Sequence, residues 1–266
     1  MTRPTLDRDT LVQELVQRLQ PLDYVRAFWE GGAVAFGRVD EWSDVDAYLL
    51  VDNSGVSDAF VAVEEALRSL SSIKQKYEVR QSPWPGVSQA FYKLENASEY
   101  LVLDLAILTL ESPEKFLGPE IHGNNRFYFN KANAAKPTPF DRQEFLEKLQ
   151  ERTKLLKARF DMFHNFVQKE INRENSLEAL DYYRSIVLGS LVEALRIRHK
   201  PVHYDFKMRY IHYELPAQVI EKLKHLSFVR NMSDLRDKNH EAIRWFYQAI
   251  ADIGDKEMQS LMSELR

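Results

Sequence analysis

The spacing of hydrophobic residues changes once along this chain, near residue 140. Before that point, apolar runs of strand length alternate with two segments of helical spacing. Helices are expected over residues 6–19 and 58–70. A first strand is expected to end at residue 30. Further strands are expected over residues 45–51, 77–80, 89–94, 100–108 and 126–129. This alternation predicts a mixed β-sheet with helices packed against it.

Beyond residue 140 the pattern is helical almost throughout. Helices are predicted over residues 145–167, 177–198, 216–226 and 232–265, and Pro201 and Pro216 mark breaks between them. The stretch 111–140 is rich in proline, glycine and asparagine, which indicates a domain junction. We therefore expect an α+β chain of two domains. Residues 1–135 would form the domain with the mixed β-sheet, and residues 136–266 an all-α helical bundle.

Composition narrows the class of protein. The chain contains no cysteine, which excludes disulfides and thiolate metal sites and suits a reducing cytoplasm. The sequence has neither a signal-type N-terminus nor an apolar run of membrane-spanning length, so we expect a soluble cytoplasmic protein without a membrane partner. The net charge of −4 disfavours nucleic acid as a partner, because broad duplex binding calls for a basic surface stripe.

Two alternating carboxylates are the first candidate chemistry. Asp44 and Asp46 open an apolar run that ends at residue 51 and is expected to be a buried strand. Side chains two residues apart on a strand point to the same face. Like charges held this close raise each other's pKa unless a cation lies between them, so the pair suggests a divalent metal site. Ligands that are all oxygen atoms favour magnesium.

Asp104 is the candidate third carboxylate, and it lies within the otherwise apolar run of residues 101–108. Burying an ionised carboxylate is costly unless the group is paired or bound to metal. Asp104 is therefore either part of the metal site or a strand-end aspartate that is hydrogen-bonded to backbone. Further upstream, Gly31 and Gly32 allow a sharp turn after the first strand, and its exposed amides would suit a phosphate group.

One joint spacing connects the glycines to the carboxylates. It is G-A-x-x-x-G-x-x-D-x-x-S-D-x-D, carried by Gly32, Ala33, Gly37, Asp40, Ser43, Asp44 and Asp46. In this spacing, with a strand directly after it, the chain resembles the nucleotidyltransferase superfamily of DNA polymerase beta type. A catalytic domain followed by a helical bundle is similar in layout to the antibiotic nucleotidyltransferases that act on aminoglycosides and lincosamides. The resemblance implies the nucleotidyltransferase fold for the first domain.

The resemblance also implies roles for individual residues. Asp44, Asp46 and Asp104 would bind two Mg²⁺ ions, and Asp104 could instead be the base for the attacking hydroxyl, a role that a carboxylate of the helical domain could also fill. The nucleotide contacts that it implies are Gly32, Ala33, Arg38, Ser43 and, from the helical domain, Lys207. Two positions depart from the family pattern, because Ala33 replaces a serine that contacts phosphate and Phe36 replaces a basic residue.

The sequence therefore predicts an enzyme that moves a nucleoside monophosphate to a hydroxyl of a small acceptor such as an antibiotic. AMP from ATP is the expected group, and another nucleoside triphosphate is the alternative donor. Two other interpretations remain. One is a catalytically weak nucleotide-binding or regulatory module, which Ala33 suggests. The other is a nucleic-acid-modifying nucleotidyltransferase, which the acidic charge balance disfavours. The acceptor and the choice between monomer and homodimer are left open by the sequence.

Overall fold

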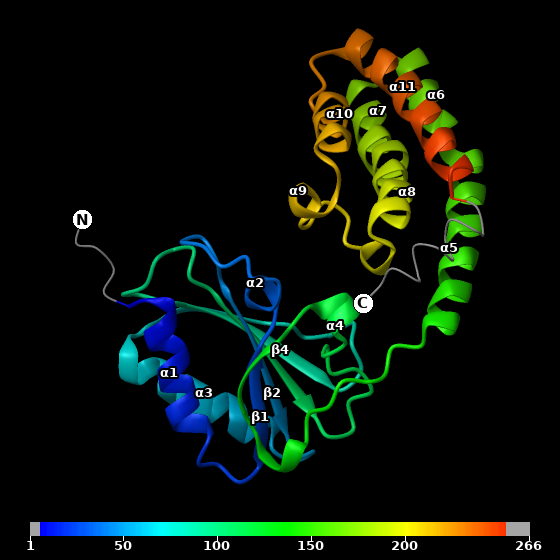
Figure 1. The fold of residues 1–266 in the computed structure, drawn as a ribbon. Coiled ribbons are helices and arrows are strands. Elements are labelled where there is room, and N and C mark those ends of the chain that lie inside the picture. Colours follow the sequence, from blue (N-terminus) through cyan, green and yellow to red (C-terminus); the bar gives the residue numbers. More distant parts are fainter. Residues whose placement is uncertain (1–5, 254–266) are drawn as a thin grey trace. The chain divides into compact units, whose positions relative to one another are not determined.

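The computed structural model describes residues 6–253 of the chain. The chain divides into two compact units, one ending at Phe140 and the other beginning at Asp141 (Figure 1). The first unit contains the β-sheet, and the described residues of the second unit contain helices without strands. The α+β class predicted from the sequence is confirmed. Within residues 6–253, every helix is too short or too polar to cross a membrane.

A mixed sheet of six strands forms the centre of the first unit. The strands are β1 (Val25–Glu30), β2 (Val45–Val51), β3 (Ile73–Glu78), β4 (Val87–Leu94), β5 (Leu103–Thr109) and β6 (Arg126–Asn130). Their order across the sheet is β3-β4-β5-β2-β1-β6. The two central strands β2 and β5 pair in parallel, and the other described pairs are antiparallel. Parallel pairing brings the starts of β2 and β5 to the same edge of the sheet.

One face of the sheet is covered by α1 (Arg8–Leu19) and α3 (Val56–Leu70), which also pack against each other (Figure 1). The N-terminus of α1 is capped by Asp7, whose side chain accepts a hydrogen bond from the Thr10 amide. Leu11 and Leu15 give α1 an apolar stripe that joins a core shared with strand residues such as Leu49. This core accounts for the apolar spacing by which the elements were predicted.

The opposite face carries a smaller apolar cluster. Trp29 of β1 and Tyr48 of β2 stack there with ring centroids 5.5 Å apart, and Leu117 packs in the same cluster. Because side chains alternate along a strand, Asp46 lies on the same face as Tyr48, and the strand register places Asp104 beside it. The carboxylates therefore border an apolar surface of the sheet.

Some elements of the first unit differ from the prediction in their bounds. β3 begins four residues earlier than expected, because it is an edge strand with mostly exposed side chains and lacks an apolar alternation. β5 begins at Leu103 instead of residue 100. The turn expected at Gly31 and Gly32 leads into the single helical turn α2 (Gly32–Ala35). Two other short turns were not expected, because single turns give no periodic pattern. They are α4 (Pro119–His122) and the 3-10 turn η1 (Lys131–Asn133).

The second unit is built from helices around a buried α8. The helices are α5 (Arg142–Phe163), α6 (Asn165–Asn172), α7 (Ser176–Tyr182), α8 (Gly189–His199), α9 (Ile211–Glu214), α10 (Ala217–Ser227) and α11 (Met232–Ala251), with a 3-10 turn η3 (Pro201–His203). A π-helical segment, η2 (Tyr183–Leu188), joins α7 to α8. Helices α5 and α11 pack against α8, and the rings of Phe160 and Phe246 stack with their centroids 3.7 Å apart.

Two of the predicted long helices are interrupted. The helix expected over residues 145–167 is divided at His164 into α5 and α6. The helix expected over 177–198 changes to π-helical geometry at Tyr183 and returns to α-helix at Gly189. Hydrophobic spacing does not detect such breaks, because the apolar side continues across them. The last predicted helix ends at Ala251 in the described range, and its expected continuation over 254–265 lies outside the described residues.

Candidate functional site

The glycine turn and the carboxylate pair form one local structure. The amide of Gly31, directly after β1, donates a hydrogen bond of 3.0 Å to the backbone carbonyl of Asp46. Gly32 has φ +52°, and a β-carbon at this position would lie 1.6 Å from Oδ2 of Asp46. Any side chain at Gly32 would therefore displace the carboxylate. The spacing read from the sequence reflects a direct contact between Gly32 and Asp46.

Asp46 and Asp104 lie opposite each other on the two central parallel strands. The register of β2 and β5 pairs them directly. Neighbouring strands are about 4.8 Å apart, and paired residues present their side chains on the same face. Asp44 is exposed and lies one residue before β2 begins. The structure thus brings Asp46 and Asp104 together at the end of the sheet where both strands start, and Asp44 lies two residues before Asp46.

Asp104 is partly buried, and burial is the main reason that its pKa is raised above the ordinary aspartate value. A hydrogen bond from Gln89 lowers the pKa, and the negative charge of Asp44 raises it. The bond runs from Nε2 of Gln89 to Oδ1 of Asp104 and measures 2.7 Å. Gln89 was not identified from the sequence, because a polar residue on a half-exposed strand carries no special pattern.

The carboxylates do not by themselves enclose a metal ion. Within residues 6–253, no three histidine, cysteine, aspartate or glutamate side chains are grouped so that they could hold one. The Mg²⁺ ligands named from the sequence therefore stay a prediction. Magnesium is usually bound by one or two protein carboxylates and takes its remaining ligands from substrate phosphates and water. Carboxylate oxygens at the edge of the sheet are chemically suited to that mode of binding.

The other nucleotide contacts expected in this unit lie between β1 and β2. Ala33 lies in the single turn α2, and its carbonyl accepts a hydrogen bond of 2.8 Å from the Arg38 amide. The Arg38 guanidinium lies over the Phe36 ring, 5.0 Å from its centroid. The Ser43 hydroxyl donates to Oδ1 of Asp40 at 2.8 Å and closes a turn just before the carboxylate pair. Ser43 thus shapes this loop, a role that the sequence did not indicate.

Lys207 lines a pocket of about 480 Å³ within the helical unit. Arg159 of α5 and Arg184 of η2 line the same pocket. Lys207 has φ +52°, and its carbonyl accepts a hydrogen bond of 2.6 Å from the fully buried Arg196, which also donates to Glu214 at 2.7 Å. The buried guanidinium therefore fixes the turn that presents Lys207. Arg159 was missed from the sequence, because exposed arginines on helices are common.

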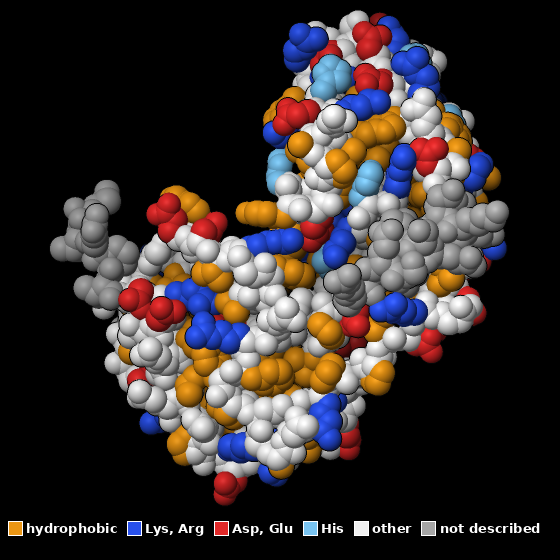
Figure 2. All heavy atoms as spheres, viewed as in Figure 1, with side chains coloured by type: hydrophobic (Ala, Val, Ile, Leu, Met, Phe, Trp, Pro, Cys, Tyr) orange, Lys and Arg blue, Asp and Glu red, His pale blue; other side chains and the backbone are white. Residues whose placement is uncertain are grey.

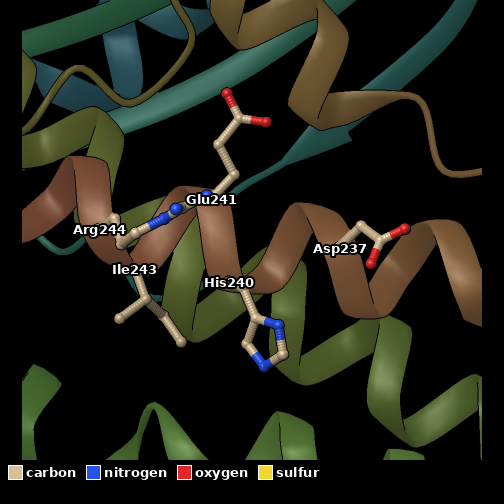
Figure 3. Close-up of a pocket in the computed structure, with 5 residues that line it drawn as sticks. All are labelled: Asp237, His240, Glu241, Ile243 and Arg244. Carbon is tan, nitrogen blue, oxygen red and sulfur yellow. The ribbon is translucent and has the colours of Figure 1, made fainter.

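Another pocket, of about 600 Å³, lies on the surface of α11 (Figure 3). It is lined by Asp237, His240, Glu241, Ile243 and Arg244. All of these residues come from one helix, and their side chains point in different directions instead of converging (Figure 3). The residues of the sequence motif are not among them, so we assign no chemistry to this pocket.

Comparisons with known proteins give matches among solved structures alone. No protein-family model and no curated protein sequence matches the chain. An aminoglycoside 6-adenyltransferase from Bacillus subtilis is similar at 12% sequence identity and a TM-score of 0.36, over 96% of this chain and 91% of that chain. A spectinomycin adenyltransferase from Enterococcus faecialis, solved with ATP and spectinomycin, is similar at 10% identity and a TM-score of 0.35, over 97% of this chain and 99% of that chain. Both of these proteins are nucleotidyltransferases.

Proposed function

We propose that this chain is a nucleotidyltransferase that moves a nucleoside monophosphate, AMP from ATP, to a hydroxyl group of a small acceptor. The observation that carries the proposal is the direct pairing of Asp46 with Asp104, with the Asp46 carboxylate packed against Gly32. This geometry places a glycine turn suited to phosphate next to two carboxylates on one face. Two carboxylates on one face suit a divalent cation, because a positive charge between them offsets their repulsion.

Asp44, Asp46 and Asp104 would hold magnesium, and two ions are the number that the motif implies. Their oxygens are the ligands that this ion prefers, and triphosphate oxygens would complete its coordination. When bound, the metal neutralises negative charge at the α-phosphate and on the departing pyrophosphate. The partly buried Asp104 fits this arrangement, because a cation beside it would offset the cost of ionising the carboxyl.

The acceptor hydroxyl must lose its proton during the reaction. Its oxygen forms a bond to the α-phosphorus, the bond from that phosphorus to the pyrophosphate oxygen breaks, and the proton passes to a base. Asp104 is one candidate for the base, because burial raises its pKa and makes the carboxylate a better proton acceptor. A carboxylate of the helical unit is the alternative. Holding both substrates in line would supply much of the rate.

The helical unit has its own candidate group of cations for binding phosphate oxygens. Lys207, Arg159 and Arg184 line one pocket. A fourth pocket cation, Arg152, is neutralised by Glu193, with Nη2 and Oε2 2.9 Å apart. Asp205 also lines the pocket, so four cations face two carboxylates and the charge of the lining is positive, which suits phosphate oxygens.

Lys207→Met should weaken nucleotide binding by roughly ten- to a hundredfold, because a hydrogen bond to a charged group contributes about 1.5–3 kcal/mol. Calorimetry with magnesium and a non-hydrolysable ATP analogue measures this affinity. Lys154→Met is the matched control, because Lys154 is exposed on α5 and does not line the pocket. If both variants bind the analogue as tightly as the unaltered protein, Lys207 has no part in binding the nucleotide.

Ala33→Ser should tighten nucleotide binding by up to about tenfold, because a hydroxyl at this position would restore one hydrogen bond to phosphate, worth about 1.5 kcal/mol. The same calorimetric titration measures the change. The result also tests the position of the turn, because a serine that faces phosphate must improve binding. Weaker binding would show that the loop has packed around the alanine methyl group and that Ala33 does not meet phosphate.

Pyrophosphate release from ATP in the presence of magnesium tests the proposed activity directly. The assay would survey small hydroxyl compounds as acceptors, including aminoglycosides and other antibiotics. We expect release that depends on both magnesium and a fitting acceptor. Nucleotide binding without release for any acceptor would instead favour a catalytically weak nucleotide-binding module, the second candidate, for which Ala33 in place of a serine is the specific observation.

A nucleic-acid acceptor is disfavoured by the distribution of charge. The net charge is −4, and basic and acidic side chains are interspersed over the described atoms of the face in Figure 2. Backbone binding to nucleic acid requires basic residues gathered along a stripe or patch. RNA binding that weakens steeply with added salt would restore this alternative.

A further inference from the structure

The residue beside the candidate site with no role assigned so far is Gln89. It lies on β4, the neighbour of β5 on the side away from β2. In the antiparallel register of β4 and β5, Gln89 pairs with Ala106 and Phe91 pairs with Asp104. Gln89 is therefore the diagonal neighbour of Asp104 on the same face of the sheet. It approaches Asp104 from the side opposite to Asp46.

The contact fixes one of the two carboxylate oxygens of Asp104. Nε2 of Gln89 donates to Oδ1 at 2.7 Å, a short distance for a nitrogen donor and typical of a bond to a charged acceptor. Within the described residues this is the hydrogen bond that the Asp104 side chain forms. With Oδ1 engaged by the amide, Oδ2 is the atom left to meet a metal ion or an acceptor hydroxyl.

We propose that Gln89 is a positioning residue for the nucleotidyl transfer, which holds Asp104 in one rotamer through Oδ1 and thereby aims Oδ2 at the reacting groups. The inference rests on the proposed function and deepens it. An aspartate side chain turns freely about two bonds, so a single strand position does not fix its oxygens. The amide anchor on the next strand supplies that restraint, and Gln89 acts through Asp104 without touching the substrates.

Two substitutions separate the parts of this role. Gln89→Met keeps the length of the side chain and removes the donor, and it should lower kcat by roughly ten- to a hundredfold and weaken magnesium-dependent nucleotide binding. Gln89→Glu keeps the shape of the side chain and replaces the donor with a negative charge beside Asp104, so kcat should fall further than in Gln89→Met. Gln75→Met on the edge strand β3 is the matched control, because Gln75 is exposed and should leave kcat unchanged.

A double-mutant cycle with Asp104→Asn distinguishes positioning from a general structural role. Gln89→Met should have less than about a twofold effect in the Asp104→Asn background, because its effect passes through that carboxylate. Binding of magnesium with a non-hydrolysable ATP analogue, measured by calorimetry, should show the same dependence independently of turnover. Thermal melting should show that each variant is folded.

Coupled losses in kcat or in metal-dependent binding support the inference. Equal losses in both backgrounds, or a Gln89→Met variant with unaltered kcat and binding, overturn the inference and leave the proposed function standing. If the unaltered protein neither binds the magnesium–nucleotide complex nor transfers from it, the proposed function fails, and the role of Gln89 fails with it.

Discussion

Asp46→Asn is expected to abolish nucleotidyl transfer while the fold is retained. The asparagine side chain fits the same space against Gly32, but it removes the negative charge that would bind metal. Metal stabilisation of the transferred phosphate is worth several kcal/mol, so the loss should be about a thousandfold or greater. Pyrophosphate release and magnesium affinity should be measured together with the thermal melting temperature.

The matched control for this substitution is Asp58→Asn, which removes a carboxylate from the exposed first turn of α3. Both variants should melt close to the unaltered protein, and the control should keep its activity. If Asp46→Asn keeps its magnesium affinity and its activity, Asp46 is not a metal ligand.

Asp104→Asn is expected to slow transfer by about a hundredfold or more, whether Asp104 binds metal or acts as the base. Binding of magnesium to the unaltered protein should also release protons, because the metal displaces a proton from Asp104, whose pKa is raised by burial. Calorimetry in buffers of different ionisation enthalpy counts these protons, and the substitution should lower the count. Near-normal turnover of the variant would make Asp104 a structural residue and place the base in the helical unit.

The same substitution should raise the melting temperature of the metal-free protein at neutral pH. Burial raises the folded-state pKa of Asp104 above its unfolded value, so the bound proton stabilises the fold below the unfolded pKa. This stabilisation is lost as the pH rises through the folded-state pKa. Asparagine does not ionise, so the variant should melt at a higher temperature than the unaltered protein at pH 7. This difference in melting temperature should shrink as the pH falls. Melting with a chelator over a pH series measures it, and lower stability at every pH would contradict a functional role for the carboxyl.

The part of the site that was predicted from the sequence is the part fixed by local geometry. Asp44 and Asp46 follow the two-residue period of a strand, and the spacing back to Gly32 reflects a contact within one turn. The direct pairing of Asp46 with Asp104 could not be predicted in the same way. It depends on the order of the strands in the sheet, because β3 and β4 lie between the two strands in the chain but beyond β5 in space.

The residues that were missed become recognisable through their neighbours in the fold. In the sequence, Gln89 is one polar residue on a half-exposed strand. Only the strand register shows that it lies diagonal to Asp104. Arg159 is an exposed helix residue, and only the packing of the helices shows that it lines one pocket with Lys207. The edge strand β3 was misplaced at its start for a related reason, because its exposed side chains give no apolar alternation. Hydrophobic patterning identifies buried surfaces, and polar groups that meet across elements leave no comparable pattern.

The fate of the individual phosphorus atoms of ATP tests the proposed reaction most directly. ATP labelled at the α-phosphorus and ATP labelled at the γ-phosphorus would be supplied in parallel, with magnesium and an acceptor, to the unaltered protein and to Asp46→Asn. A nucleotidyltransferase places the α label on the acceptor and releases the γ label in pyrophosphate, and the Asp46→Asn variant should do neither. Transfer of the γ label to the acceptor, or equal α-label transfer by Asp46→Asn, would contradict the proposed function.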